Sequence, residues 1–310
     1  MMVPYVLRLL CLCSALFFLL HLTITAAVAA VAGRAIGLAE QMAADRAARL
    51  LLALRLLPPV LAGILVSGIG APSYLWLEPD AAAEHVGWPC LAAALLGCSI
   101  CAAGLAGAAR AAVRSNRYLR HCRRVAESDA PVVMLAGVFR PRLVVSRGVR
   151  RALAPDQLAA AVRHEWAHRA SHDNLKRLLM AAVPCAFPFG HGLRRLERGW
   201  ARMSEWAADD RAAAGSERRS LALAGALLKV ARMGAGGQVA LAASPLATSL
   251  MAEAGDLEVR VERLLNPRAP ARAWRSPRWV VAAVAAAGAA IVFQPGTQVA
   301  AHSLLEQLMR

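Results

Sequence analysis

The stretch that says most about the fold and the candidate site is residues 155–172, which read PDQLAAAVRHEWAHRASH. Pro155 suits the first turn of a helix, because no intrahelical hydrogen bond is lost there. The apolar and polar residues that follow predict one helix from Pro155 to about Leu179. On such a helix His164 and His168 stand four residues apart, so both imidazoles face the same side about one turn from each other.

The five residues His164 to His168 form the pattern H-E-x-x-H within this predicted helix. Two imidazoles on one helix face can grip a zinc ion, and the intervening Glu165 can take a proton from the water that attacks a peptide carbonyl. The alternative is an ordinary charged helix face. The pattern favours a zinc-dependent peptidase, with His164 and His168 as metal ligands and Glu165 as the catalytic base.

A catalytic zinc site needs a third protein ligand and keeps its fourth position for water. Glu205 is the best candidate, because Glu205 and Asp209 are four residues apart on one face of the next predicted helix, about Leu193 to Ala214. One carboxylate can bind zinc while the other holds a ligand histidine through its free N–H. We predict Glu205 as ligand and Asp209 as supporting group; a solvated acidic face is the alternative.

Other polar residues are weaker candidates for the site. On an unbroken helix His172 lies about 12 Å along the axis from His164, too far to share an ion. No glycine turns the chain between positions 169 and 171. We therefore interpret His172 as solvated or supporting, and retain His172, His191 and Arg202 as possible stabilisers of the transition state.

Composition indicates a membrane protein. The 310 residues are 58% hydrophobic, with a mean hydropathy of +0.46. Three apolar runs are long enough to cross a bilayer of roughly 30 Å, and we predict a fourth, shorter span. The predicted transmembrane helices are residues 6–32, 50–70, 88–109 and 279–293.

Charge gives the orientation of these spans. The formal charge of +16 is almost entirely arginine, and six arginines lie between positions 110 and 124, directly after the third run. The connection 71–87 contains acidic residues and no lysine or arginine. The positive-inside rule therefore places the N-terminus outside and residues from 110 onward in the cytoplasm. The arginines at a membrane flank predict anionic lipids as partners, with no nucleic acid expected.

The predicted fold class is a mainly α integral-membrane protein with a cytoplasmic α+β domain. Residues 1–110 hold three transmembrane helices, residues 111–268 the globular domain, and residues 269–310 a linker, the fourth span and a short tail. In the globular domain, Val132–Leu135 and Leu143–Ser146 are expected to form a β-hairpin.

Seven matching elements, specific in order and spacing, are residues 137–146, 153–158, 164–168, 173–174, Glu205, Asp209 and 260–265. This pattern resembles the membrane-embedded zinc peptidases of the BlaR/MecR antirepressor type, with HtpX-type proteases as more distant relatives. The resemblance covers roughly residues 110–268. It does not extend to the penicillin-binding sensor domain of that family, because only about 17 residues follow the predicted fourth span.

The resemblance implies a zincin-like domain in which Glu205 is the third zinc ligand, Asp209 supports His164 and Glu165 is the general base. It also implies that a strand near Leu143–Ser146 pairs with an extended substrate. The expected function is a zinc metalloendopeptidase of a bacterial-type inner membrane, which cleaves a cytoplasmic or membrane-proximal protein. The alternative is a catalytically silent signalling or scaffold protein with a structural zinc site.

Overall fold

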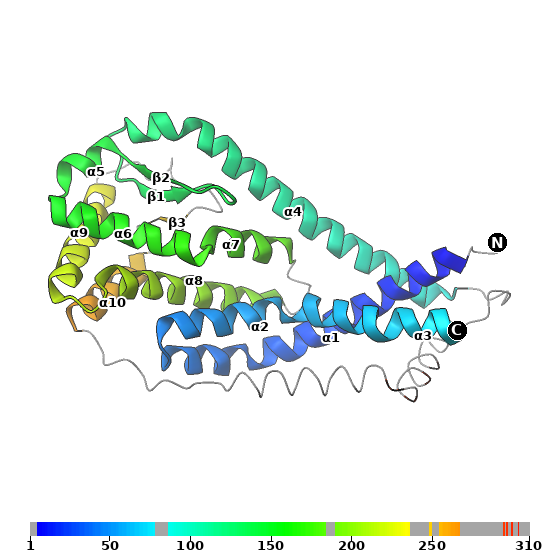
Figure 1. Cartoon of the computed structure of the whole chain (residues 1–310). Coiled ribbons are helices and arrows are strands. Elements are labelled where there is room, and N and C mark those ends of the chain that lie inside the picture. Colours follow the sequence, from blue (N-terminus) through cyan, green and yellow to red (C-terminus); the bar gives the residue numbers. More distant parts are fainter. Residues whose placement is uncertain are drawn as a thin grey trace.

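The computed structural model describes residues 5–77, 86–183, 190–235, 248–249 and 254–266, with isolated positions further on. Within these residues the chain is mainly helical with one small sheet, as the composition and patterning predicted (Figure 1). The predicted fourth span at 279–293, and residues 78–85 of the acidic connection before the third span, lie outside the described residues.

Three long helical units are apolar and long enough to cross a membrane. They are α1 (Tyr5–Glu40), α2 (Ala44–Leu65) continued through a π-helical turn (Val66–Gly70) into α3 (Ala71–Leu77), and α4 (Trp88–Ala126). Each unit includes a predicted span and extends beyond it, which confirms three such segments. The third span and the arginine-rich flank therefore form one continuous helix, α4, without a break at position 110.

The ends of these helices differ in what covers them. The C-terminal part of α1 and the N-terminal part of α2 pack against α8 (Gly190–Ala213) in one apolar core. At the other end, large apolar side chains are exposed on the N-terminal part of α1, the later part of α2 with α3, and the early part of α4. Examples of these exposed residues are Leu7, Leu10, Val60, Ile64, Trp76, Trp88 and Leu95.

A three-stranded antiparallel sheet has the order β2-β1-β3, with β1 at Val133–Ala136, β2 at Arg142–Val145 and β3 at Thr248–Ser249. The pairing of Val133 with Val145 confirms the predicted hairpin. Strand β2 contacts α4, whereas β1 and β3 contact α6, the helix that carries the metal-binding pattern. Strand β3 thus pairs with β1 on the side near α6, and β2 pairs with the opposite side of β1.

Further helices follow in the second half of the chain as the structure describes it, and α6 contacts the sheet. They are α5 (Arg147–Ala152), α6 (Pro155–Ser171), α7 (Asp173–Ala182), α8, α9 (Glu217–Ala235) and α10 (Ala254–Leu265). The N–H of Ala154 donates to the Gln157 side chain at 3.1 Å, which satisfies one donor at the start of α6. Figure 1 shows α6, α7 and α8 lying between α4 and the α1–α2 pair.

The predicted single helix from Pro155 to about Leu179 is wrong in one respect. It breaks at His172, whose backbone is left-handed with φ of 55°, so α6 ends at Ser171 and α7 begins at Asp173. The unbroken helix assumed for His172 therefore does not exist. A non-glycine residue in this conformation costs free energy and persists only where its surroundings hold it.

Candidate metal centre

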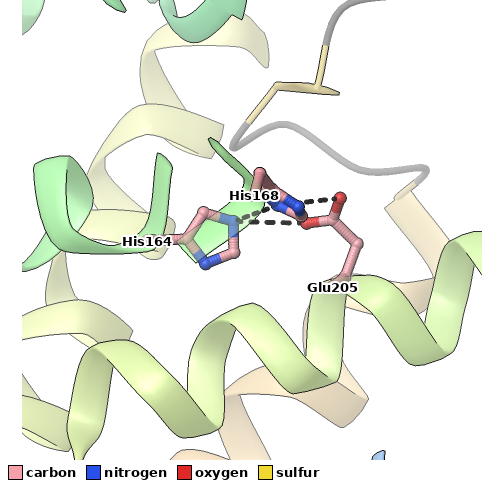
Figure 2. Close-up of side chains that lie close together, drawn as sticks. All are labelled: His164, His168 and Glu205. Carbon is pink, nitrogen blue, oxygen red and sulfur yellow. Dashed lines mark hydrogen bonds and ion pairs between the residues drawn. The ribbon is translucent and has the colours of Figure 1, made fainter. Parts of the chain in front are cut away.

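Three side chains from two helices meet at one buried point. The Nε2 atoms of His164 and His168, both on α6, lie 3.1 Å apart. The Glu205 carboxylate of α8 approaches them, with Oε2 at 3.4 Å from His164 Nε2 and Oε1 at 3.5 Å from His168 Nε2. Figure 2 shows both rings and the carboxylate pointing toward one another. The structure therefore brings together the three residues that the sequence predicted as ligands, in a group that could hold a metal ion.

The separations of these donor atoms fit a small tetrahedral ion. Donors bound at about 2.0–2.1 Å with tetrahedral angles lie roughly 3.3–3.4 Å from each other. The two imidazole nitrogens are 3.1 Å apart, and each lies within 3.5 Å of one of the two Glu205 oxygens, which is close to that value. Two neutral imidazole nitrogens and a carboxylate oxygen are also a donor set found in catalytic zinc sites, where the fourth position belongs to water.

Each ligand histidine has a carboxylate on its other ring nitrogen. His164 Nδ1 lies 2.9 Å from Asp209 Oδ1, and His168 Nδ1 lies 2.8 Å from Asp173 Oδ2. Such a partner accepts a hydrogen bond from Nδ1–H, which fixes the tautomer and leaves the Nε2 lone pair facing the metal. Asp209 thus lies where the sequence predicted. Asp173, for which the sequence alone predicts no specific role, supports His168 in the same way.

Arg260 of α10 is a member of this site that sequence reasoning missed. Its guanidinium donates two hydrogen bonds of 2.8 Å to Asp209, and its Nη1 lies 3.2 Å from Glu205 Oε2. The side chain is fully buried. Arg260 therefore neutralises two carboxylates at once, in the planar fork geometry that suits arginine. Residues 260–265 are one of the stretches that carry the family resemblance, but nothing local marks Arg260 as part of the centre.

Burial and charge compete at every titratable group here. Burial alone would lower the pKa of His168, but the Glu205 charge and the hydrogen bond to Asp173 outweigh it and raise the pKa to about 10. Burial would raise the pKa of Glu205, yet His168 and Arg260 hold it well below its usual range. The Glu205 carboxylate is thus ionised, and without metal the imidazole pair carries the compensating proton.

Glu165 behaves differently from the other carboxylates. It is fully buried on α6 beside His164, and burial raises its pKa to about 7, because the histidine charges offset burial only in part. A carboxyl group with a pKa near neutrality can both accept and release a proton at physiological pH. This is the property required of the residue that the sequence predicted as the base.

The break at His172 is held from both sides. Asp173 contacts His168 and also receives a 2.9 Å hydrogen bond from Lys176. The next residue, Asn174, donates from its side chain to the carbonyls of Leu135 and Gly137, at 3.0 and 2.7 Å. These contacts tie the start of α7 to the β-hairpin, so the left-handed turn positions Asp173 against His168.

The three possible stabilisers of the transition state have different surroundings. His172 is exposed and lines a cavity of about 750 Å³ that also reaches His168, Phe139 and Trp166. His191 is exposed near the start of α8, about 21 Å along the helix axis from Glu205. Arg202 contacts Glu40 of α1 and stacks over the Trp206 ring. Only His172 therefore shares a cavity with a predicted metal ligand.

Comparisons of the chain with models of protein families, with curated proteins and with solved structures find no match. The centre described above thus stands on the geometry of this chain alone.

Proposed function

We propose that this protein is a membrane-bound zinc-dependent metalloendopeptidase with a zincin-like catalytic domain. The observation that carries the proposal is the convergence of His164, His168 and Glu205, whose ligand atoms lie close enough together to hold one metal ion. Glu165 adds an acid–base group beside the first ligand. Asp209, Asp173 and Arg260 supply the outer partners that a metal site needs to keep its ligands oriented.

In this proposal His164, His168 and Glu205 hold the zinc, which supplies a Lewis acid when bound. Glu165 takes a proton from the attacking water and later gives it to the leaving amine, as its pKa near neutrality permits. Arg260 keeps Glu205 and Asp209 ionised, and Asp209 holds His164 in the tautomer that presents Nε2. The chain's own residues thus account for metal holding, ring orientation and proton transfer.

The peptide substrate is expected to approach along the cavity of about 750 Å³ beside α6. Its lining includes exposed Phe139 and Arg140 from the hairpin connection, and it reaches His168 and His172. An extended substrate could also pair with the strand near Leu143–Ser146, because β2 lies at an edge of the described sheet.

Membrane attachment is supported by the exposed apolar side chains on α1, α2 with α3, and α4 at the end away from the metal centre. The arginines in the later part of α4 follow these apolar surfaces directly. We place the metal centre on the cytoplasmic side of a bacterial-type inner membrane, with several spans, on the positive-inside rule. A protein substrate in or near that membrane follows from this placement.

A second candidate is a silent signalling or scaffold protein with a structural metal site. It is favoured by burial, because both ligand histidines and Glu165 have no solvent exposure. Against it stands the donor count, since structural zinc sites commonly use four protein ligands and this group provides three. The two candidates differ in whether Glu165 performs chemistry.

Replacement of Glu165 by glutamine distinguishes the peptidase from the scaffold protein. The full chain, purified in detergent and loaded with zinc, is incubated with an unfolded casein as a general substrate. We expect the E165Q variant to retain stoichiometric zinc and to lose about 10²–10⁴-fold in cleavage rate, the usual contribution of a general base. The exposed Glu217 on α9 provides the matched control, because E217Q should leave both zinc content and cleavage unchanged. Unaltered cleavage by E165Q would refute the proposed base, and a protein that binds zinc stably but never cleaves would favour the scaffold.

A further inference from the structure

A second cavity, of about 880 Å³, lies between α2, α4, α7 and α8. It is separate from the cavity beside α6 and shares none of its lining residues. Its size falls in the range of small-molecule sites. Nothing in the proposed peptidase mechanism uses it.

The lining of this cavity is strongly cationic. Five arginines contribute to it against one acid, Glu197, so its described lining has a formal excess of four positive charges with histidine neutral. The arginines are Arg55, Arg177, Arg194, Arg195 and Arg198. Such an excess within one concave surface attracts anions, because the low-dielectric walls focus the field.

Two arginines of α8 carry like charges close enough to repel each other, which lowers the stability of the helix. Arg194 and Arg198 are four residues apart, where like charges destabilise a helix. A bound anion offsets this repulsion, because it brings negative charge between the two guanidinium groups.

The arginines on the other wall are already oriented. Arg55 is fully buried and donates to the carbonyls of Met180 and Val183 at 3.1 and 2.7 Å, which fixes its guanidinium at the end of α7. Arg177 stacks over the Trp200 ring, and its Nε atom is buried without a hydrogen-bond acceptor among the described residues. A guanidinium whose orientation is fixed in advance loses less entropy when it binds an anion.

The cavity lies at the level where a bilayer surface is expected. On α2 it includes Arg55, and exposed apolar side chains begin at Leu57 immediately after. On α4 it includes Ala111, which follows the last predicted residue of the third span and lies between Arg110 and Arg114. Phosphate groups of lipids occupy this level, and clustered arginine between membrane helices suits them.

We propose that this cavity binds a phosphate group, held by Arg177, Arg194 and Arg198 against the wall formed by Arg55. Two sources carry this chemistry: the headgroup of an anionic phospholipid, which the level of the cavity favours, and free inorganic phosphate. The proposal does not depend on peptidase activity, although one of its arginines, Arg177, also lies 4.0 Å from the Glu205 carboxylate of the metal centre.

The test uses the full chain, purified in detergent and stripped of lipid, with native mass spectrometry as the readout of binding. The probes are dioctanoyl phosphatidylglycerol, dioctanoyl phosphatidylcholine and inorganic phosphate. The variant R194Q/R198Q removes two exposed cavity charges and should not disturb folding. The matched control R114Q/R117Q removes two exposed charges from α4 outside the cavity lining.

We expect phosphatidylglycerol to bind the wild type more tightly than phosphatidylcholine, and R194Q/R198Q to weaken it about tenfold or more. The α4 control should weaken it less than threefold. If phosphate binding falls in R194Q/R198Q while phosphatidylglycerol binding does not, the site exists and its ligand is free phosphate. Equal losses in both double variants would mean general surface attraction and would overturn the proposal, as would no loss in R194Q/R198Q for any probe.

Discussion

The two ends of this molecule reverse the usual rule for what a protein buries. At the metal-centre end, α6, α8 and α10 bury His164, His168, Glu205, Asp209 and Arg260 with almost no exposure. At the other end, α1, α2 with α3, and α4 expose leucine, valine, isoleucine and tryptophan side chains. In a soluble protein, burial of these charged groups would cost free energy, and the exposed apolar side chains would promote aggregation.

Each reversal is explained by a partner that the chain is built to meet. Buried charges are tolerated when they are paired, and here Glu205, Asp209 and Asp173 each have a histidine or arginine partner. Exposed apolar surface is tolerated when lipid covers it. The comparison therefore predicts two costs. Removing a charge at the metal-centre end is costly because its buried partner is left unpaired, and adding a charge at the apolar end is costly because it would contact lipid.

The largest effect is expected from Arg260→Met, which keeps most of the side-chain volume and removes the charge. Asp209 and Glu205 would then be buried without their common cation, and breaking a buried pair in this way costs about 3–5 kcal/mol. Arg147 provides a matched control, because it makes the same two-bond contact with Asp129 at 3.0 and 3.1 Å on the exposed surface. Chemical denaturation in detergent should show a large loss for R260M and little change for R147M. Similar losses would mean that burial does not govern the metal-centre end.

The next effect tests the apolar end. Leu95 on α4 is 58% exposed, so Leu95→Lys would be nearly neutral in a soluble protein. If lipid surrounds this part of α4, a lysine near the span centre costs about 2.5–3.5 kcal/mol of insertion free energy. Val113, on the same helix after the predicted span, is also exposed, and V113K should insert like the wild type. A membrane-insertion assay of the α4 segment measures both variants; equal insertion of L95K and V113K would contradict a lipid-facing α4.

A smaller effect is expected from Asp173→Asn, which keeps the shape of the side chain but removes the charge that holds His168 Nδ1. Outer partners of this kind usually contribute 10–100-fold to metal affinity. Asp156, exposed at the start of α6, gives the control variant D156N. Competition with a zinc chelator should show the loss in D173N alone. Wild-type affinity in D173N would mean that Asp173 anchors the helix and does not support the ligand.

The sequence predicted the centre of the site because its signals are local. The spacing of His164 from His168, and of Glu205 from Asp209, is a property of the helix backbone, so one face carries each pair before any tertiary contact forms. The hairpin was predictable for the same reason, since its strands are short and adjacent in the sequence.

What the sequence could not supply depends on contacts between distant segments. Arg260 is 51 residues from Asp209, and an arginine in an amphipathic helix has no local feature that marks it as buried. The break at His172 was missed because the expected signal, a glycine, is absent. Hydrogen bonds from Asn174 to the β-hairpin and from His168 to Asp173 hold the left-handed backbone in place of that glycine.

The smallest effect is the pH dependence of metal binding, which tests whether the buried charges are balanced by a proton. In the metal-free chain the pKa of His168 is raised to about 10, and the pKa of Glu205 is lowered, so between pH 6.5 and 10 the histidine keeps a proton while the carboxylate is ionised. The stabilisation from that proton is fully present below about pH 6.5 and is lost as the pH rises through about 10. Metal must displace the same proton, and the pKa of His164 is raised as well, so apparent zinc affinity should rise at least about tenfold, or ~1.4 kcal/mol, per pH unit across this window. Calorimetric titrations in two buffers of different ionisation enthalpy would count the protons released. A count near zero at pH 7.5 would mean that the imidazoles are neutral before metal arrives, and that the carboxylates and Arg260 alone balance the charge at this end of the molecule.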